Sequence, residues 1–237
     1  MNLIVACILA GGFSYFLRKP IRKHPGVFYL VALAVDALMM TNAIAGFSPV
    51  AARMLFPYLQ QSLFAFGILS VVMMVGVLPE GSLKRSLRPI RGELSIIASI
   101  LIAGHVVHYA NPMLTRVFFG GMDATAGTFW GTVLSLVLIA LLVVLTVTSF
   151  KVVRNAMASV TWKRVQMLAY VFYGLVFCHV FAMLLPSAMG GGAKAVVNVV
   201  LYVAILLVYV VGRLGRAYRD RHAENMRFAP DGELAEA

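Results

Sequence analysis

Long apolar stretches separated by short polar segments rich in charged residues, proline and glycine make up most of the chain. Seven apolar stretches can be marked, at residues 3–17, 27–47, 57–78, 94–110, 129–150, 165–185 and 195–212. A helix of about 20 apolar residues crosses a hydrocarbon layer of about 30 Å. The pattern therefore predicts an all-α fold, a polytopic membrane bundle of about seven transmembrane helices.

The first stretch is the shortest, and its basic residues follow it instead of preceding it. A secretory signal peptide has the opposite order, with a basic segment in front of the apolar run. We therefore expect residues 3–17 to remain as a span, with the N-terminus outside.

Lys and Arg gather in alternate connections, and this distribution predicts the orientation. All but three of the 20 basic residues lie in the first, third and fifth connections or in the tail. The four clusters are Arg18, Lys19, Arg22 and Lys23; Lys84, Arg85, Arg88 and Arg91; Lys151, Arg154, Lys163 and Arg164; and Arg213, Arg216, Arg219, Arg221 and Arg227. Seven alternating spans put every cluster on one side, which the positive-inside rule makes cytoplasmic. We expect residues 1–212 to form a multi-pass bundle in the cell inner (cytoplasmic) membrane and residues 213–237 a cytoplasmic tail.

The composition excludes a soluble globule and a disordered chain. Apolar residues make up 61% of the 237 residues and charged residues only 12%, whereas soluble domains carry about 25% charged residues. The net charge of +11 is explained by the topology, so we expect membrane lipid and no nucleic acid as a partner. Both cysteines, Cys7 and Cys178, lie inside apolar stretches, a pattern typical neither of a disulfide framework nor of a zinc site.

Ionisable residues inside the predicted spans are the candidates for function, because they are expensive to insert. Asp36 lies near the middle of the second span. A carboxylate there costs about 2.5–3.5 kcal/mol on insertion scales, so it requires a partner or a proton. Asp36 is a candidate proton or quinone site, and a structural hydrogen bond to a neighbouring helix is the alternative.

Two of the histidines are predicted to lie at one depth in different helices. His105 follows Arg91 by 14 residues and His179 follows Arg164 by 15, which places the imidazoles about 21 and 22 Å from these basic anchors. Both are then somewhat past the midplane, toward the outer side. Two neutral imidazoles at one level suit the axial positions of a b-type haem between helices. The alternative is a pair of structural histidines that bridge helices by hydrogen bonds.

Two segments carry a family resemblance. Residues 91–108, RGELSIIASILIAGHVVH, resemble the first haem helix of the ferric reductase-like transmembrane domain family. They are most like its bacterial branch, the haem-binding membrane subunit of protein-methionine-sulfoxide reductase. Residues 162–179, WKRVQMLAYVFYGLVFCH, are similar to the second haem helix of the family. The resemblance covers about residues 78–185 and implies that His105 and His179 are iron ligands.

One position departs from the family pattern. The family commonly has a further histidine two residues after the Trp-Lys-Arg start of the second haem helix, where this chain has Gln166. Since an amide is a poor iron ligand, we expect one haem b per chain, near the outer side. His108, one turn beyond His105, is an alternative ligand, a haem propionate contact or an interfacial histidine. Arg116 is a candidate propionate partner because it is a cation on the outer side.

These observations predict a membrane b-type cytochrome that carries electrons from a quinol or flavin-bearing donor to an acceptor at the outer face, such as a periplasmic redox partner. No catalytic residue is assigned, and the chain is expected to be an electron-transfer subunit or module of an oxidoreductase. One alternative is a proton-coupled small-molecule or ion transporter that uses Asp36 and the histidines. Another alternative is a structural membrane protein without a cofactor.

Overall fold

The computed structural model describes residues 2–40, 61–119 and 126–228, and every regular element in these ranges is a helix. This confirms the all-α prediction. In chain order the elements are α1 (Asn2–Phe16), α2 (Arg18–Lys23), α3 (Pro25–Met40), α6 (Gln61–Val75), α7 (Ser82–Leu87), the 3-10 turn η1 (Arg88–Ile90), α8 (Arg91–Leu114), the π-helical turn η2 (Thr115–Phe119), α9 (Ala126–Ser149), α10 (Lys151–Ala156), α11 (Ser159–Met189) and α12 (Ala193–Phe228).

Over the described residues, each of the seven predicted apolar stretches coincides with one helix, and the long helices extend past the predicted ends. Helix α8 continues through Pro112, and α11 continues through Pro186. Hydrophobicity marks only the part of a helix that needs an apolar environment, whereas the backbone hydrogen bonds continue into the flanking polar residues. The predicted segments 41–47 and 57–60 lie outside the described residues.

Four helical segments of the described chain are long and apolar enough to cross a membrane: Ser82–Ala110, Gly127–Ser149, Ser159–Met189 and Ala193–His222. Three shorter apolar helices accompany them: Asn2–Phe16, Pro25–Met40 and Ser62–Val75. Large apolar side chains are exposed on the outside of the bundle, for example Leu30 on α3 and Val200 on α12. An apolar outer surface of this extent is typical of a protein surrounded by lipid.

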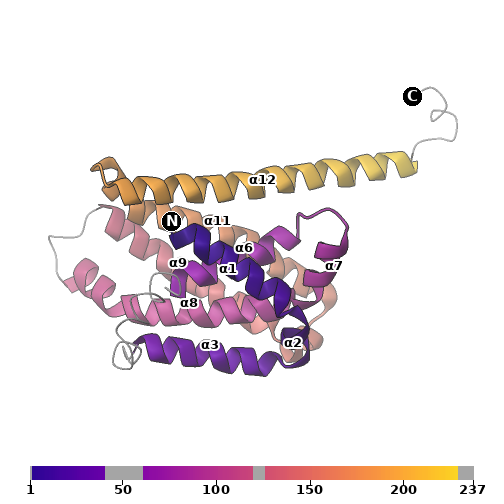
Figure 1. Ribbon diagram of the computed structural model, residues 1–237, viewed down its shortest axis with the longest axis horizontal. Coiled ribbons are helices and arrows are strands. Elements are labelled where there is room, and N and C mark those ends of the chain that lie inside the picture. Colours follow the sequence, from indigo (N-terminus) through magenta and orange to yellow (C-terminus); the bar gives the residue numbers. More distant parts are fainter. Residues whose placement is uncertain (1, 41–60, 120–125, 229–237) are drawn as a thin grey trace.

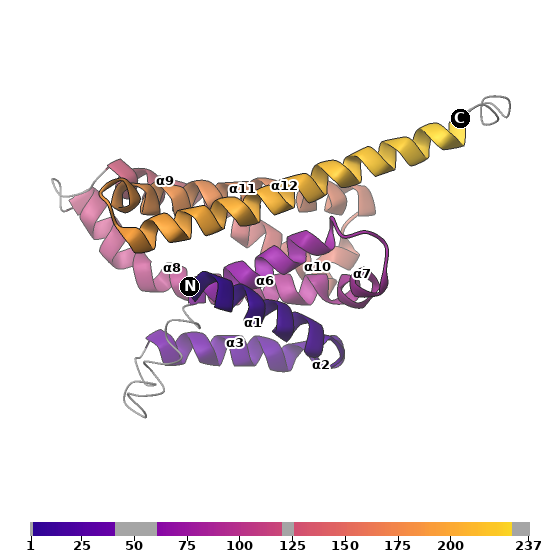
Figure 2. The ribbon, with the colours of Figure 1, turned by 45° about the horizontal axis from the view of Figure 1, so that its top comes forward.

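Helix α8 lies at the centre of the arrangement, in contact with α3, α6 and α9. Beyond these neighbours, α1 packs on α6, and α11 packs between α9 and α12. Helices α3 and α12 lie on opposite sides of the bundle, and α12 projects well beyond it (Figure 1, Figure 2). The 36 residues of α12 give it a length of about 54 Å, more than a bilayer core requires.

Small residues let the helices approach closely. A methyl group added to Gly67 on α6 would lie 2.8 Å from Ala10 Cβ and 3.1 Å from the Ala6 carbonyl oxygen of α1. Helices in membranes gain stability from such close backbone packing, since lipid tails compete for every apolar contact. Helices α1 and α6 each contribute buried side chains to two apolar clusters, with Ala10 and Ile68 in one and Leu3 and Phe66 in the other.

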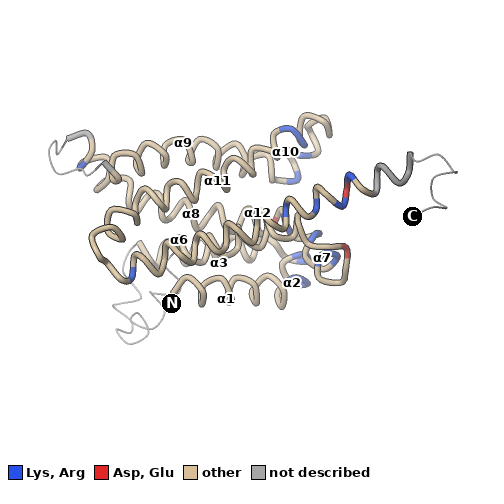
Figure 3. Tube along the Cα trace, turned by 90° about the horizontal axis from the view of Figure 1, so that it is seen from above, with Lys and Arg blue, Asp and Glu red and all other residues tan. Residues whose placement is uncertain are grey.

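Lys and Arg residues gather at one end of the helices, around α2, α7, α10 and the projecting part of α12 (Figure 3). At this end the buried Glu93 of α8 binds the Lys151 ammonium of α10 at 3.0 Å and accepts a hydrogen bond from the Tyr29 hydroxyl of α3. A carboxylate held by a cation and a hydroxyl is stabilised despite its burial. Glu93 therefore ties three helices together at the basic end.

Candidate functional site

The close crossing of α9 and α11 positions His179. A methyl group on Gly127 would lie 2.5 Å from the Ala182 carbonyl oxygen, and one on Gly131 would lie 2.5 Å from Met183 Sδ. The Ala182 carbonyl is free to turn toward α9 because Pro186, four residues on, has no N–H to donate to it. The two glycines are four residues apart, the spacing of small residues that allows membrane helices to touch.

At this crossing the imidazole of His179 is oriented by two atoms of α9. Its Nδ1 lies 3.0 Å from the Gly131 carbonyl oxygen and 3.2 Å from Ser135 Oγ. A carbonyl oxygen only accepts hydrogen bonds, so Nδ1 carries the proton and donates it. In the neutral ring Nε2 then has a free lone pair. This is how proteins orient a histidine that binds a metal through its other nitrogen.

His105 lies half-buried on α8, and His179 lies half-buried on α11. Helices α8 and α11 both contact α9, so the two histidines that were predicted to share one depth lie on neighbours of the same helix. The Tyr109 ring lies one turn further along α8, with its centroid 4.8 Å from that of His105. Tyr109 thus restricts the ring of His105 from one side.

His108 and Arg116 occupy more open positions than His105. The His108 side chain is exposed, and its ring meets the Tyr109 ring edge-on at a centroid distance of 4.8 Å. Arg116 is exposed in η2, eleven residues beyond His105. Of these three side chains, His105 is the one that lies half-buried.

Asp36 lies on α3, buried, with its carboxylate packed against the backbone of Gly104 on α8. A methyl group at Gly104 would be 2.4 Å from Asp36 Cγ. Because Gly104 immediately precedes His105, the structure places the predicted proton or quinone residue beside the segment that carries a predicted ligand.

Gln166 bridges helices at the other end of α11. Its side-chain Nε2 donates a hydrogen bond of 3.0 Å to Thr148 Oγ1 on α9. Trp162, one turn before it, donates from Nε1 to the Thr148 carbonyl oxygen at 2.9 Å. Gln166 therefore has a structural partner at the position where the family pattern has a histidine.

The donor set suits a haem better than a metal held by protein groups alone. Within the described residues there is no group of three or more His, Cys, Asp or Glu side chains arranged to hold a metal ion. A pair of imidazoles is sufficient for a haem, because the porphyrin supplies the other nitrogen ligands and the protein only the axial ones. His105 on α8 and His179 on α11, helices that both contact α9, are the two imidazoles that could serve in this way.

Sequence reasoning missed three residues of the site: Gly131, Ser135 and Tyr109. The first two belong to a row of small residues at four-residue spacing, starting at Gly127, and such rows mark close helix crossings. Tyr109 follows His105 by four residues, a spacing that puts two side chains on one helix face. Both spacings can be read from the sequence, although neither of them indicates a function.

The long apolar helices indicate a membrane protein of the helical class, in which His179 is oriented by the Gly131 carbonyl of α9. The chain is 39% identical over 209 residues to a protein of Treponema pallidum (strain Nichols) that is described as uncharacterized. The alignment covers 86% of this chain and 58% of that relative, so this chain spans little more than half of the relative's length. No family model matches the chain. No solved structure matches it either.

Proposed function

We propose that the chain is a membrane b-type cytochrome of the ferric reductase-like type, with one haem b held between His105 and His179. It passes electrons from a quinol or flavin-bearing donor to an acceptor at the outer face, as an electron-transfer subunit or module of an oxidoreductase. The observation that carries the proposal is the orientation of His179. Its Nδ1 donates to the Gly131 carbonyl at 3.0 Å, which leaves Nε2 available as a ligand.

The bound haem would supply one-electron transfer, and the residues of the chain would set its position and its potential. His105 and His179 would hold the iron from two helices. Gly131 and Ser135 would fix the tautomer of His179 through Nδ1. The buried carboxylate of Asp36, beside Gly104, would hold or release a proton near the His105 segment or accept a hydrogen bond from a quinol.

Visible spectroscopy of the purified full chain from haem-replete cells tests this proposal. We expect a Soret band that shifts on reduction with dithionite, and about one haem per chain by pyridine haemochrome assay. His105→Ala and His179→Ala should each abolish the band, because a haem loses an axial ligand in either variant. His108→Ala should retain it.

His24→Ala is the matched control, since His24 is an exposed histidine in the connection between α2 and α3. It should leave the spectrum unchanged. A colourless wild-type protein would contradict the proposal as a whole. Loss of the band in His108→Ala, with His105→Ala unaffected, would contradict the assignment of the ligand on α8.

The proposal includes a topology of seven spans in the inner membrane, with the N-terminus outside and residues 213–237 in the cytoplasm. It is supported by a helix in each of the seven apolar stretches and by the Lys and Arg residues at one end of the bundle (Figure 3). Gly190→Cys and Gly81→Cys form a matched pair. Gly190 directly follows α11, and Gly81 directly precedes α7 at the basic end. An impermeant maleimide applied to spheroplasts should label Gly190→Cys alone, and labelling of Gly81→Cys alone would reverse the orientation.

A further inference from the structure

A cavity of about 550 Å³ lies between α1, α6, α7 and α12 and opens at the surface of the bundle. We call it the α1–α12 groove; its lining includes Gly11, Tyr15, Met74, Leu83, Leu87 and Val208. The lining is almost wholly apolar, and the hydroxyl of Ser70 on α6 already accepts a hydrogen bond of 3.0 Å from Tyr173. The volume is within the range of cavities that bind small ligands. The groove therefore offers an apolar ligand room but few polar anchors along its length.

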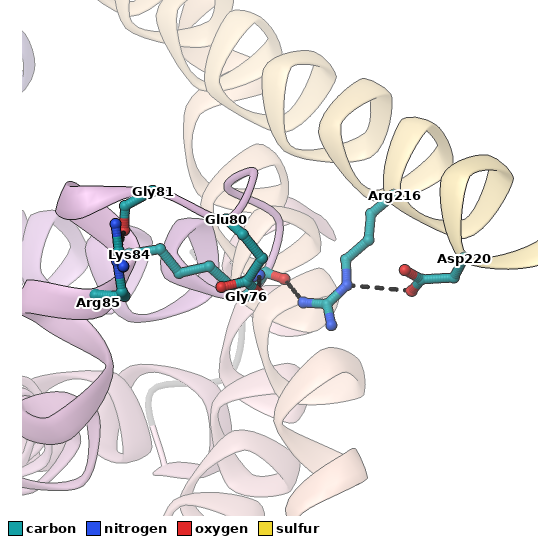
Figure 4. Close-up of polar contacts among 7 residues, drawn as sticks. All are labelled: Gly76, Glu80, Gly81, Lys84, Arg85, Arg216 and Asp220. Atoms are coloured by element: carbon teal, nitrogen blue, oxygen red, sulfur yellow. Dashed lines mark hydrogen bonds and ion pairs between the residues drawn. The ribbon is translucent and has the colours of Figure 1, made fainter. Parts of the chain in front are cut away.

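Cationic side chains surround the basic end of the groove. The Arg18 guanidinium lies 4.2 Å from the centre of the Tyr15 ring, which lines the groove. Helix α7 contributes two groove residues and also carries Lys84 and Arg85. From α12, the Arg216 guanidinium donates a hydrogen bond to the Gly76 carbonyl at the end of α6 (Figure 4).

The acidic residues at this end are engaged in ion pairs. Glu80 Oε1 lies 2.7 Å from Lys84 Nζ, and Asp220 Oδ2 lies 3.3 Å from Arg216 Nε (Figure 4). The charge of Arg88 also acts on Glu80. Glu93, also at this end, pairs with Lys151. Cations outnumber these three carboxylates, since Arg18, Lys84, Arg85, Arg88, Lys151 and Arg216 belong to the same end. The surplus positive charge favours an anion at the depth where the helices end and lipid headgroups begin.

We propose that the α1–α12 groove binds one anionic phospholipid. An acyl chain lies along the apolar lining, and the phosphate lies among Arg18, Arg85 and Arg88. The continuity of an apolar groove with a cationic rim matches the two chemically different parts of such a lipid. An isoprenoid quinone fits less well, because its carbonyl oxygens need hydrogen-bond donors inside the groove, where the lining is apolar. The site is independent of the haem proposal, since none of its residues belongs to the histidine site.

A groove-filling substitution tests the acyl-chain part of the site. A Cβ atom on Gly11 would meet no other atom within 4 Å, so Gly11→Leu should fill the groove without disturbing the helix. Native mass spectrometry of the full chain in mild detergent, titrated with equal amounts of phosphatidylglycerol and phosphatidylcholine, measures binding. The wild type should retain phosphatidylglycerol preferentially, and Gly11→Leu should lose at least about tenfold in retention.

Gly174→Leu is the matched control, because a Cβ atom at Gly174 on α11 also meets no atom within 4 Å, and this residue is not among those lining the groove. It should bind phosphatidylglycerol like the wild type. Equal retention of the two lipids by the wild type, or undiminished retention by Gly11→Leu, would overturn the proposal. Recovery of an isoprenoid quinone that Gly11→Leu displaces would overturn the choice of occupant.

Charge-neutralising substitutions test the headgroup part of the site. Arg18→Gln and Arg85→Gln should each weaken phosphatidylglycerol binding about fivefold and leave phosphatidylcholine binding unchanged. Lys194→Gln, in the first turn of α12 and far along the helix from Arg216, should change neither. Inorganic phosphate added at the same concentration should not displace the lipid. Full displacement by phosphate would overturn the acyl-chain contact, and equal losses in all three variants would overturn the headgroup site.

Discussion

The carboxylate of Asp36 on α3 rests against the backbone of Gly104 on α8, one residue before His105. The contact leaves no room for a side chain, because a Cβ atom at position 104 would lie 2.4 to 2.6 Å from the carboxylate atoms of Asp36. The absence of a side chain at Gly104 thus allows α3 to approach α8. The same approach buries a titratable group beside the histidine that we propose as a ligand.

Gly104→Ala should therefore lower stability and disturb the His105 segment. The new methyl group would force the buried carboxylate or the backbone of α3 to move, and overpacking of this kind costs about 1–3 kcal/mol. We expect a lower thermal midpoint in detergent, measured by intrinsic fluorescence.

Gly174→Ala is the control for the change in helix propensity, since its Cβ enters open space. It should keep or raise the midpoint, because alanine favours a helix over glycine by about 1 kcal/mol. Equal midpoints for the two variants would show that Asp36 is not packed on Gly104.

Ser135 should tune the proposed haem through His179 without binding it. Its Oγ lies 3.2 Å from His179 Nδ1 and donates to the Gly131 carbonyl oxygen at 2.9 Å. A hydrogen bond accepted from Nδ1–H makes the imidazole more basic, and a more basic ligand favours ferric iron. Ser135→Ala should therefore raise the reduction potential while the haem content stays near one per chain, as measured by spectroelectrochemical titration.

Thr146→Val is the matched control on the same helix, because the Thr146 hydroxyl bonds only within α9, to the Leu142 carbonyl oxygen at 2.6 Å. Its potential should equal that of the wild type. A fall in potential in Ser135→Ala, or a shift of equal size in Thr146→Val, would contradict the tuning role.

The helices could be predicted from the sequence because long apolar stretches have few alternatives in a membrane. The expectation that His105 and His179 share one depth came from counting residues from basic anchors, since helix rise is constant. Which face of each helix turns inward could not be predicted in the same way. Helix α11 is apolar on all sides, so hydrophobic periodicity does not say where His179 points.

The partners of the site residues depend on packing between helices that are distant in the chain. The contact of Asp36 with Gly104 joins residues 68 positions apart, and nothing local to either residue indicates it. The bond from His179 to Gly131 was closer to prediction, because the small-residue row of α9 indicates a close crossing. The row does not indicate which helix packs against α9.

Gln166 should stabilise the crossing of α9 and α11 and have no part in haem binding. Its hydrogen bond to Thr148 Oγ1 measures 3.0 Å, and such side-chain bonds in membrane proteins average about 0.6 kcal/mol in double-mutant cycles. A cycle of Gln166→Leu and Thr148→Val, measured by denaturant unfolding in mixed micelles, should give a coupling energy of about that size. The haem spectrum should not change in either variant, and its loss in Gln166→Leu would place a cofactor ligand at the inner end of α11.

The ion pair of Glu80 and Lys84 at the basic end of the bundle should make the stability of the fold depend on pH. The hydrogen bond from the Lys84 ammonium lowers the pKa of the Glu80 carboxyl below its ordinary value of 4.5, and the charges of Arg88 and Arg216 act in the same direction. A carboxyl whose pKa is lower in the folded than in the unfolded chain stabilises the fold above the unfolded pKa. This contribution is lost as the pH falls through the lowered value.

In an NMR titration of ¹³C-labelled glutamate, Lys84→Met should move the Glu80 midpoint up toward 4.5. Arg85→Met, the control on the same helix, should leave it in place, since Arg85 bonds instead to the Gly81 carbonyl at 3.3 Å. A midpoint that responds equally to both substitutions would mean that the general positive field of this end, and not the Lys84 bond, lowers the pKa.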